Sequence, residues 1–213
     1  MIKKKNSHYF DTTCIDFEPI SISVDLGFGN IQVHSAKNVF SFSGLDKGTT
    51  VLLHYLSSSR GQQWLESTDL THVLDLGCGW GPISLYLANK SKSSHIIGVD
   101  VNEFAVKLTA DNAKLLGFSN VQSANPDDVT KDAKITAVVS NPPIRIGKDE
   151  LHAILRRWYA QLVGGGSMIM VVQKNLGADT LIDWMIANLD GADVLKVASS
   201  KGFRIITVDK PIQ

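Results

Sequence analysis

The amino-acid sequence predicts an α/β fold built on a doubly wound, mostly parallel sheet, and two observations lead to that prediction. From Thr71 onward, short apolar runs typical of buried strands alternate with longer segments of helical periodicity. Before about residue 66, helical periodicity is scarce, and apolar residues instead recur at every second position. We therefore expect a small β-rich extension over residues 1–66, packed on a main domain over residues 67–213.

The extension is expected to hold a β-hairpin, a further short strand and one helix. Ile20–Val24 and Ile31–His34 alternate with period two on either side of the turn residues Gly27–Asn30. Val39–Ser43 has the composition of another short strand. A helix is expected from about residue 49 to residue 58. Its buried face would carry Val51, Leu52, Tyr55 and Leu56.

Seven strands are expected in the main domain, and the residues between them indicate where helices begin and end. Pro82 opens one helix at a favoured first position, Asn102 caps the next helix, and Gly117 closes it. Two more helices are expected over residues 151–162, ended by Gly164–Gly166, and over residues 180–189. The last two strands lie too close in sequence for a parallel crossover, so this Rossmann-like architecture should end in an antiparallel hairpin. The expected strands are residues 72–76, 95–100, 121–123, 135–140, 168–172, 194–197 and 203–208.

Composition narrows the class of protein. Hydrophobic residues make up 44% of the chain and charged residues 20%, which is typical of a soluble domain with a sizeable core. The 21 basic and 21 acidic residues cancel, so any nucleic-acid site has to be a local patch. Cys14 and Cys78 are expected as free thiols, and neither has metal-ligand spacing around it. Without a signal-peptide pattern or an apolar run of ~20 residues, we expect a cytoplasmic protein with no membrane span and no metal.

The most informative motif is Asn141-Pro142-Pro143, which directly follows the expected strand 135–140. Proline cannot donate to a sheet ladder and pushes the residue before it toward extended geometry, so the motif ends the strand abruptly. It places an asparagine amide at the carboxyl end of a strand, where open α/β sheets bind ligands. A rigid amide oxygen and backbone carbonyl there can accept hydrogen bonds from a flat group that carries N–H. Asn-Pro alone would favour a plain turn.

A glycine loop upstream makes a ligand site the better interpretation. Gly77-Cys78-Gly79-Trp80-Gly81 joins a strand to a helix, and its glycines allow a tight turn and the close approach of a ligand. Asp100 ends the next strand roughly 20 residues later, a spacing that suits a carboxylate accepting hydrogen bonds from both ribose hydroxyls. A dinucleotide fingerprint needs a third glycine where this chain has Pro82, so S-adenosylmethionine suits the loop better than NAD.

On these motifs, the chain resembles class I S-adenosylmethionine-dependent methyltransferases of the small methyltransferase domain family. Within that family it is similar to the bacterial guanine-N2 methyltransferases of small-subunit ribosomal RNA and to their short single-domain relatives. The resemblance covers nearly the whole chain. It rests on His8-Tyr9-Phe10, Val39-Phe40-Ser41, Leu45–Thr49, Trp80-Gly81-Pro82, Val99–Asn102, Asn141–Arg145, Gly147-Lys148 and Lys201–Phe203, which occur in the family's order.

The resemblance implies how an acceptor would be held. Asn141-Pro142-Pro143 would be the catalytic motif: its asparagine accepts a hydrogen bond from the exocyclic amine to be methylated, aided by the carbonyl of the first proline. Ile144 would contact the substrate, and Arg145 and Lys148 are candidates for binding its phosphates. Hydrogen bonds to the amine protons favour the sp³-like nitrogen of the transition state, so neither a strong base nor a metal is needed.

The resemblance also implies S-adenosylmethionine, and its product S-adenosylhomocysteine, at the glycine loop. The methionine part would lie above Asp75, the ribose on Asp100 and the adenine against Val101. The segment 46–49 would form a lid near the methionine carboxylate. The cofactor residues expected in this way are Asp46, Gly48, Thr49, Asp75, Gly77, Cys78, Gly79, Asp100, Val101 and Asn125.

Two positions depart from the family pattern. Relatives often carry an aromatic residue after Asn-Pro-Pro, which stacks on the planar target, whereas this chain has Ile144. Stacking would then have to come from Phe28, Phe42 or Trp80. The third strand usually ends in an aspartate that contacts the adenine amino group, and here Asn125 would have to replace it through its side-chain carbonyl.

The expected function is therefore methyl transfer to an exocyclic amine, most specifically to N2 of a guanine in ribosomal RNA. Ribosomal RNA or a ribosomal subunit would be the partner. The same motif suits any planar NH₂ group, so adenine N6 and the glutamine N5 of a protein stay open as targets. A non-catalytic module that binds RNA or the cofactor stays open as well, and so does the oligomeric state.

Overall fold

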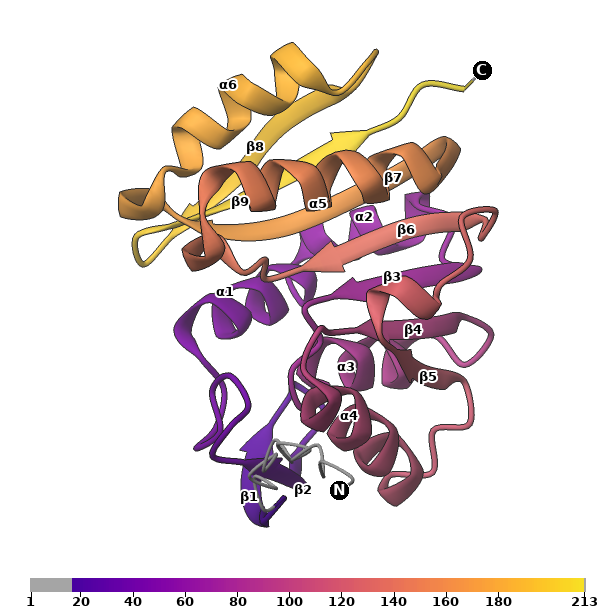
Figure 1. Cartoon of the computed structure of the whole chain (residues 1–213), viewed down its shortest axis with the longest axis vertical. Coiled ribbons are helices and arrows are strands. Elements are labelled where there is room, and N and C mark those ends of the chain that lie inside the picture. Colours follow the sequence, from indigo (N-terminus) through magenta and orange to yellow (C-terminus); the bar gives the residue numbers. More distant parts are fainter. Residues whose placement is uncertain (1–16, 213) are drawn as a thin grey trace, which may run out of the picture.

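The computed structural model describes residues 17–212 and has the α/β fold that the sequence predicts (Figure 1). The strands of its main sheet are β3 (His72–Leu76), β4 (His95–Val99), β5 (Val121–Ala124), β6 (Ile135–Ser140), β7 (Leu162–Gln173), β8 (Asp193–Ser200) and β9 (Phe203–Asp209). They lie in the order β5-β4-β3-β6-β7-β9-β8. The first five are parallel, whereas β9 runs antiparallel to both β7 and β8. The seven-stranded, mostly parallel sheet with an antiparallel C-terminal hairpin is thus confirmed.

Helices cover both faces of the sheet. One face carries α1 (Lys47–Leu56), α2 (Ser59–Ser67), α3 (Pro82–Lys90) and α4 (Glu103–Leu115), and the other carries α5 (Lys148–Gln161) and α6 (Ala178–Asn188). Figure 1 shows α5 and α6 in front of the sheet and α2 behind it. Successive residues of a strand point to opposite faces, so Val73 belongs to the core under α1–α4 and Leu74 to the core under α5 and α6. No helix within residues 17–212 is long and apolar enough to cross a membrane.

The N-terminal hairpin is confirmed, and an asparagine of α4 joins it to the glycine loop. β1 (Pro19–Asp25) and β2 (Asn30–Ala36) pair antiparallel in a separate two-stranded sheet. Asn112 of α4 is completely buried, and its Oδ1 accepts a hydrogen bond from the backbone N–H of His34, at 2.7 Å. Its Nδ2 donates to the carbonyls of His34 and of Trp80, both at 2.8 Å. One side chain thus joins the hairpin, a helix and the glycine loop. The domain boundary near residue 66 stays a prediction.

Three predicted helix signals are confirmed. Pro82 occupies the first turn of α3. The side chain of Asn102 accepts a hydrogen bond from the N–H of Phe104 at the start of α4, at 3.0 Å. Gly117 follows the end of that helix with a φ of +73°, the left-handed geometry that favours glycine.

The segment Val39–Ser43 was predicted as a strand, and the structure shows turns instead. The N–H of Val39 donates to the carbonyl of Ala36 at 2.9 Å, which turns the chain at once after β2. Ser41 has a φ of +58°, and its hydroxyl donates to the carbonyl of Gly44 at 2.7 Å. The prediction was wrong because the alternation of apolar residues here does not face a neighbouring strand.

The predicted helix 49–58 corresponds to α1, and a second helix that the sequence did not predict, α2, follows it. α1 ends at Leu56, and the side chain of Ser58 caps α2 by accepting a hydrogen bond from the N–H of Gly61. Gly61 permits this close turn, because a Cβ there would lie 2.0 Å from the carbonyl oxygen of Tyr55. Tyr55, which was predicted on the buried face of this helix, is only half-buried. Leu53, which was not predicted there, is buried.

The triple glycine was predicted to end a helix, whereas it lies inside β7. α5 ends at Gln161, and the strand begins at Leu162. A Cβ on Gly166 would lie 2.9 Å from the carbonyl oxygen of Thr136 in β6, so the two backbones approach closely here. The register between β6 and β7 also shifts between Ile135 and Ala137. The glycines therefore serve an irregular strand start.

Replacing Asn112 tests the attachment of the hairpin. We expect Asn112→Ala to lower the free energy of unfolding by about 3 kcal/mol, because it leaves buried backbone groups of His34 and Trp80 without partners. Urea unfolding measures this change. The exposed Asn188→Ala is the matched control and should lie within about 0.5 kcal/mol of wild type. Equal stabilities for the two variants would contradict the linking role of Asn112.

Candidate active site at the carboxyl edge of the sheet

The carboxyl ends of β3, β4 and β6 bring the predicted motifs together. The hydroxyl of Ser140, the last residue of β6, donates to the carbonyl of Leu76, the last residue of β3, at 2.7 Å. The glycine loop and Asn141-Pro142-Pro143 therefore leave the sheet side by side. A Cβ on Gly77 would lie 3.8 Å from both the carbonyl oxygen of Asn141 and Cδ of Pro143. The predicted adjacency of the two motifs is present in the structure.

The glycine loop depends on backbone geometry that other residues rarely adopt. Gly77, Gly79 and Gly81 have φ values of +76°, +58° and +95°. The N–H groups of Gly77 and Cys78 both donate to the carbonyl of Val99, at 2.9 and 3.0 Å, which ties the loop to the end of β4. Burial is the main cause that raises the pKa of the Cys78 thiol well above its usual value. This thiol is therefore a small apolar filler and no nucleophile. Cys14 and His8-Tyr9-Phe10 lie outside the described residues.

Asp75 is a completely buried carboxyl group behind the loop. Its Oδ2 accepts hydrogen bonds from the N–H of Ser84 at 2.9 Å and from the hydroxyl of Ser84 at 2.7 Å. It thereby caps α3, whose N-cap residue Gly81 offers no side chain. Its Oδ1 is buried without a partner within the described residues. Burial raises the pKa of Asp75 to about 7, the charge of Asp100 adds to the rise, and the Ser84 hydrogen bonds oppose it.

Asp100 lies at the opposite edge of the loop. Its Oδ2 accepts from the N–H of Gly79 at 3.1 Å, and its Oδ1 accepts from the N–H of Asn102 at 3.0 Å. The carboxylate is only half-buried, so it keeps lone pairs for a further ligand. The adjacent Val101 is 79% exposed and presents an apolar surface beside it.

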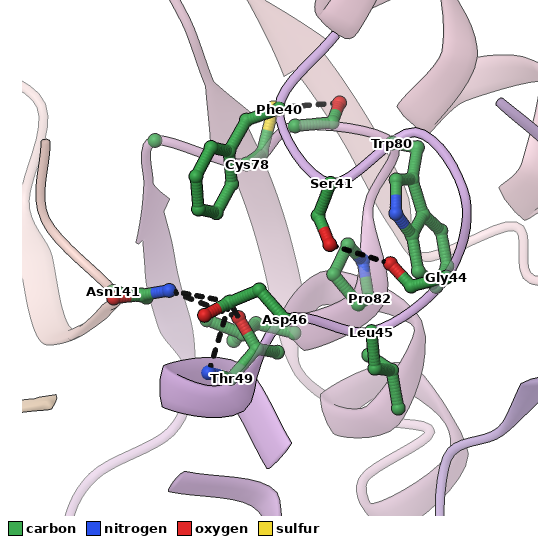
Figure 2. Close-up of a pocket in the computed structure, with 13 residues that line it drawn as sticks. Phe40, Ser41, Gly44, Leu45, Asp46, Thr49, Cys78, Trp80, Pro82 and Asn141 are labelled. Atoms are coloured by element: carbon green, nitrogen blue, oxygen red, sulfur yellow. Dashed lines mark hydrogen bonds between the residues drawn. The ribbon is translucent and has the colours of Figure 1, made fainter. Parts of the chain in front are cut away.

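A cleft lies between the glycine loop, the start of α1 and the loop formed by residues 37–46 (Figure 2). This 37–46 loop is held at one end by Asn102, whose Nδ2 donates to the carbonyl of Asn38 at 2.7 Å. At its other end, Asp46 accepts from Nδ2 of Asn141, also at 2.7 Å. The residues that line the cleft are Phe40, Ser41, Gly44, Leu45, Asp46, Thr49, Gly77, Cys78, Gly79, Trp80, Pro82, Ile83 and Asn141.

The predicted site residues Asn125, Ile144, Arg145 and Lys148 do not line this cleft. Asn125 accepts from the N–H of Asp127 at 3.0 Å and so caps the short 3₁₀ helix η1 (Pro126–Asp128). Arg145 lies in the 3₁₀ helix η2 (Ile144–Ile146), and Lys148 begins α5; both are exposed. Ile144 packs partly buried against the core under α5 and α6. The carbonyl of Pro142, predicted to help the asparagine, already accepts the N–H of Ile144 at 2.8 Å.

The structure adds an aromatic residue that the sequence interpretation did not consider. Trp80 is 1% exposed, so its ring faces are not open for stacking on a substrate, and Phe28 packs edge-on against Phe118. Phe42 is exposed but does not line the cleft. Phe40 lines the cleft and is 69% exposed (Figure 2). Its place within Val39-Phe40-Ser41, a segment that carried the family resemblance, was the signal that could have identified it.

Comparison with known proteins decides the family. The sequence profile described as methyltransferase small domain matches residues 30–207. The chain belongs to the methyltransferase small domain family. This is a family of S-adenosylmethionine-dependent methyltransferases, so the resemblance that the motifs indicated is confirmed.

Similar proteins are matched over different shares of their own length. It is 38% identical over 141 residues to the uncharacterized protein YbxB of Bacillus subtilis, covering 65% of this chain and 69% of that one. It is 28% identical to ribosomal RNA small subunit methyltransferase C of Aliivibrio salmonicida, over 84% of this chain and 50% of that protein. Among solved structures, the T. thermophilus 16S rRNA N2 G1207 methyltransferase (RsmC) in complex with AdoMet and guanosine matches with a TM-score of 0.73. The sequence identity is 22%, and the match covers 90% of this chain and 50% of that one. The chain thus spans about half the length of these two methyltransferases.

The residues around the cleft fit the cofactor of the methyltransferase small domain family. Gly77 and Gly79 line the cleft without a side chain, so a ligand can approach their backbone closely. Asp100 offers a partly exposed carboxylate of the kind that accepts ribose hydroxyls, and Val101 offers apolar surface for a flat ring. Within residues 17–212 no cluster of three or more His, Cys, Asp or Glu side chains could hold a metal ion.

The buried Asp75 generates a prediction about pH. The folded pKa of about 7 lies above the ordinary value of 3.8, so between these values the unfolded chain has lost a proton that the folded chain keeps. The stabilisation present below pH 3.8 is therefore lost as the pH rises through about 7. We expect Asp75→Asn, which stays neutral, to gain stability relative to wild type between pH 5 and pH 8. Urea unfolding of both proteins at pH 5 and pH 8 measures this gain. An equal change in the free energy of unfolding of the two proteins between these pH values would contradict the prediction.

Proposed function

We propose that this chain transfers a methyl group from S-adenosylmethionine to an exocyclic amine, and that the amine is N2 of a guanine in ribosomal RNA. The observation that carries the proposal is the placement of Asn141 beside the glycine loop, at a cleft whose other end reaches the 37–46 loop. Methyl transfer needs the acceptor and the donor side by side, and these two elements supply one binding group for each.

The proposed chemistry asks little of the protein beyond placement. When bound, S-adenosylmethionine supplies a methyl group on a sulfonium leaving group. The amine lone pair forms the new N–C bond while the C–S bond breaks. The electron pair of the broken C–S bond stays on sulfur. The amine nitrogen becomes positively charged and then releases a proton to water. Asn141 would accept a hydrogen bond from the amine, which orients its lone pair and stabilises the growing positive charge.

Guanine is proposed on the strength of relatives. Ribosomal RNA small subunit methyltransferase C of Aliivibrio salmonicida and the T. thermophilus N2 G1207 methyltransferase both act on small-subunit RNA by name, and the latter was solved with guanosine. Arg145 and Lys148 support an RNA substrate, because they are exposed beside the Asn-Pro-Pro motif and form no ion pair within the described residues. Phe40 could stack on the target base in place of the aromatic residue that Ile144 replaces. A cytoplasmic location follows from the proposed substrate.

The proposal is tested by methyl transfer itself. Wild-type protein is incubated with labelled S-adenosylmethionine and either undermethylated small subunits or the naked ribosomal RNA. The RNA is then digested to nucleosides and the protein to peptides. We expect label in N2-methylguanosine. Label in N6-methyladenosine, or in N5-methylglutamine of a protein, would replace guanine with one of the other planar amines. Absence of transfer to every acceptor, despite cofactor binding, would favour the non-catalytic module.

Two substitutions separate donor binding from acceptor chemistry. Asp100→Ala should weaken S-adenosylhomocysteine binding at least about tenfold, because it removes the carboxylate proposed for the ribose. Asn141→Ala should lower kcat by about 10²-fold or more while leaving that affinity within about twofold. Calorimetry measures the first quantity and steady-state kinetics the second. Equal losses of cofactor affinity in both variants would contradict the two roles.

A further inference from the structure

The amide nitrogen of Asn141 is already occupied inside the protein. Nδ2 donates to Oδ2 of Asp46 at 2.7 Å and to Oγ1 of Thr49 at 3.1 Å, as Figure 2 shows. The Thr49 hydroxyl donates its hydrogen bond to Oδ2 of Asp46, at 2.6 Å, so its oxygen acts as an acceptor toward Asn141. Rotating the amide by 180° would place a carbonyl against a carboxylate. Chemistry therefore fixes which end of the amide faces Asp46.

The Asp46 carboxylate is held in place independently of Asn141. It is the N-cap of α1, where Oδ1 accepts the N–H of Gly48 at 2.6 Å and Oδ2 accepts the N–H of Thr49 at 3.1 Å. The start of a helix favours negative charge, so the fold itself supplies a fixed anion at this point. Asn141 docks onto that anion from the end of β6.

A side chain at Gly48 would crowd the docked amide of Asn141. Its φ lies outside the left-handed region, so the backbone does not require glycine here. A Cβ at this position would lie 3.1 Å from Oδ1 and 3.2 Å from Nδ2 of Asn141. Glycine in a helix is less favourable than alanine, which points to a use for the space that it leaves. That space is filled by the Asn141 amide.

We propose that Asp46, Gly48 and Thr49 are positioning residues that turn Oδ1 of Asn141 outward as a fixed hydrogen-bond acceptor for the substrate amine. This inference rests on the proposed function. Oδ1 accepts no hydrogen bond from the described residues, so it is the free end of the amide. The negative charge of Asp46 strengthens Oδ1 as an acceptor through the amide, and the attacking amine becomes positive. The three residues would therefore act on turnover, whereas the contact with the methionine carboxylate that the family resemblance implies would act on cofactor affinity.

The orientation of the amide is tested first in the free protein, without any reaction. In ¹H–¹⁵N spectra, the side-chain NH₂ of Asn141 should exchange with solvent at least about tenfold more slowly in wild type than in Asp46→Asn. Asparagine is as good an N-cap as aspartate, so α1 is kept in this variant. Thr50→Val is the matched control. It removes a hydroxyl in the same helical turn, and this hydroxyl donates to the backbone carbonyl of Asp46 rather than to its carboxylate. Equal exchange in wild type and Asp46→Asn would overturn the proposed orientation.

Kinetics then test what the orientation does. Asp46→Asn and Thr49→Val should each lower kcat about 10- to 100-fold, with the Kd of S-adenosylmethionine changed less than about twofold. Thr49→Ser, which keeps the hydroxyl, should recover most of the activity, and Thr50→Val should match wild type. Gly48→Ala should lower kcat although its melting temperature is unchanged or raised, a combination that a merely structural role for Gly48 does not give.

The outcomes separate this inference from the function on which it rests. Wild-type kcat in Asp46→Asn or in Gly48→Ala would overturn the positioning role and leave the proposed function intact. A loss of S-adenosylmethionine affinity as large as the loss of kcat would also overturn it, and would return Asp46 to the methionine carboxylate. A wild-type protein that methylates none of the acceptors would overturn the proposed function, and with it the kinetic role of the three residues.

Discussion

The parallel pairing of β3 with both β4 and β6 is the constraint on which the site depends. Parallel strands end at the same edge of a sheet, so the residues after each of these strands have to share one region of space. The glycine loop, Asp100 and Asn141 are far apart in sequence and meet only because of this pairing. Ser140 reinforces the meeting point, because its hydroxyl bonds the carbonyl at the end of β3.

A second set of contacts adds the N-terminal region to that edge. Asn112 binds the backbone of β2 and of the glycine loop, and Asn102 binds the 37–46 loop beside Asp100. Asp46 then joins the end of the loop to Asn141. Each of these side chains forms a hydrogen bond with a segment far away in the sequence. The extension is therefore part of the cleft, which the sheet alone would leave open on one side.

The sequence predicted the features that depend on local patterns, and it missed those that depend on distant partners. The strand runs of the hairpin and of the main sheet and the Asn102 cap follow from neighbouring residues, and these are present. The turns at Val39–Ser43 form because Asn102 and Asp46 hold the loop from either end, and α2 forms because Gly61 lets one helix begin against the end of another. Asp46 and Asn141 are 95 residues apart, so neither local pattern could show that they touch.

Two buried or partly buried carboxyl groups near the cleft are treated in opposite ways by the same fold. Asp75 is completely buried with one oxygen unpartnered, and this desolvation favours its neutral form up to a pH of about 7. Asp46 instead accepts two backbone N–H groups, a hydroxyl and an amide, an arrangement that suits a carboxylate anion. Asp75 lies behind the glycine loop, where burial makes its charge costly. The charged group lies behind Asn141, where a reacting amine would turn positive, so the fold places its fixed negative charge where the proposed chemistry can use it.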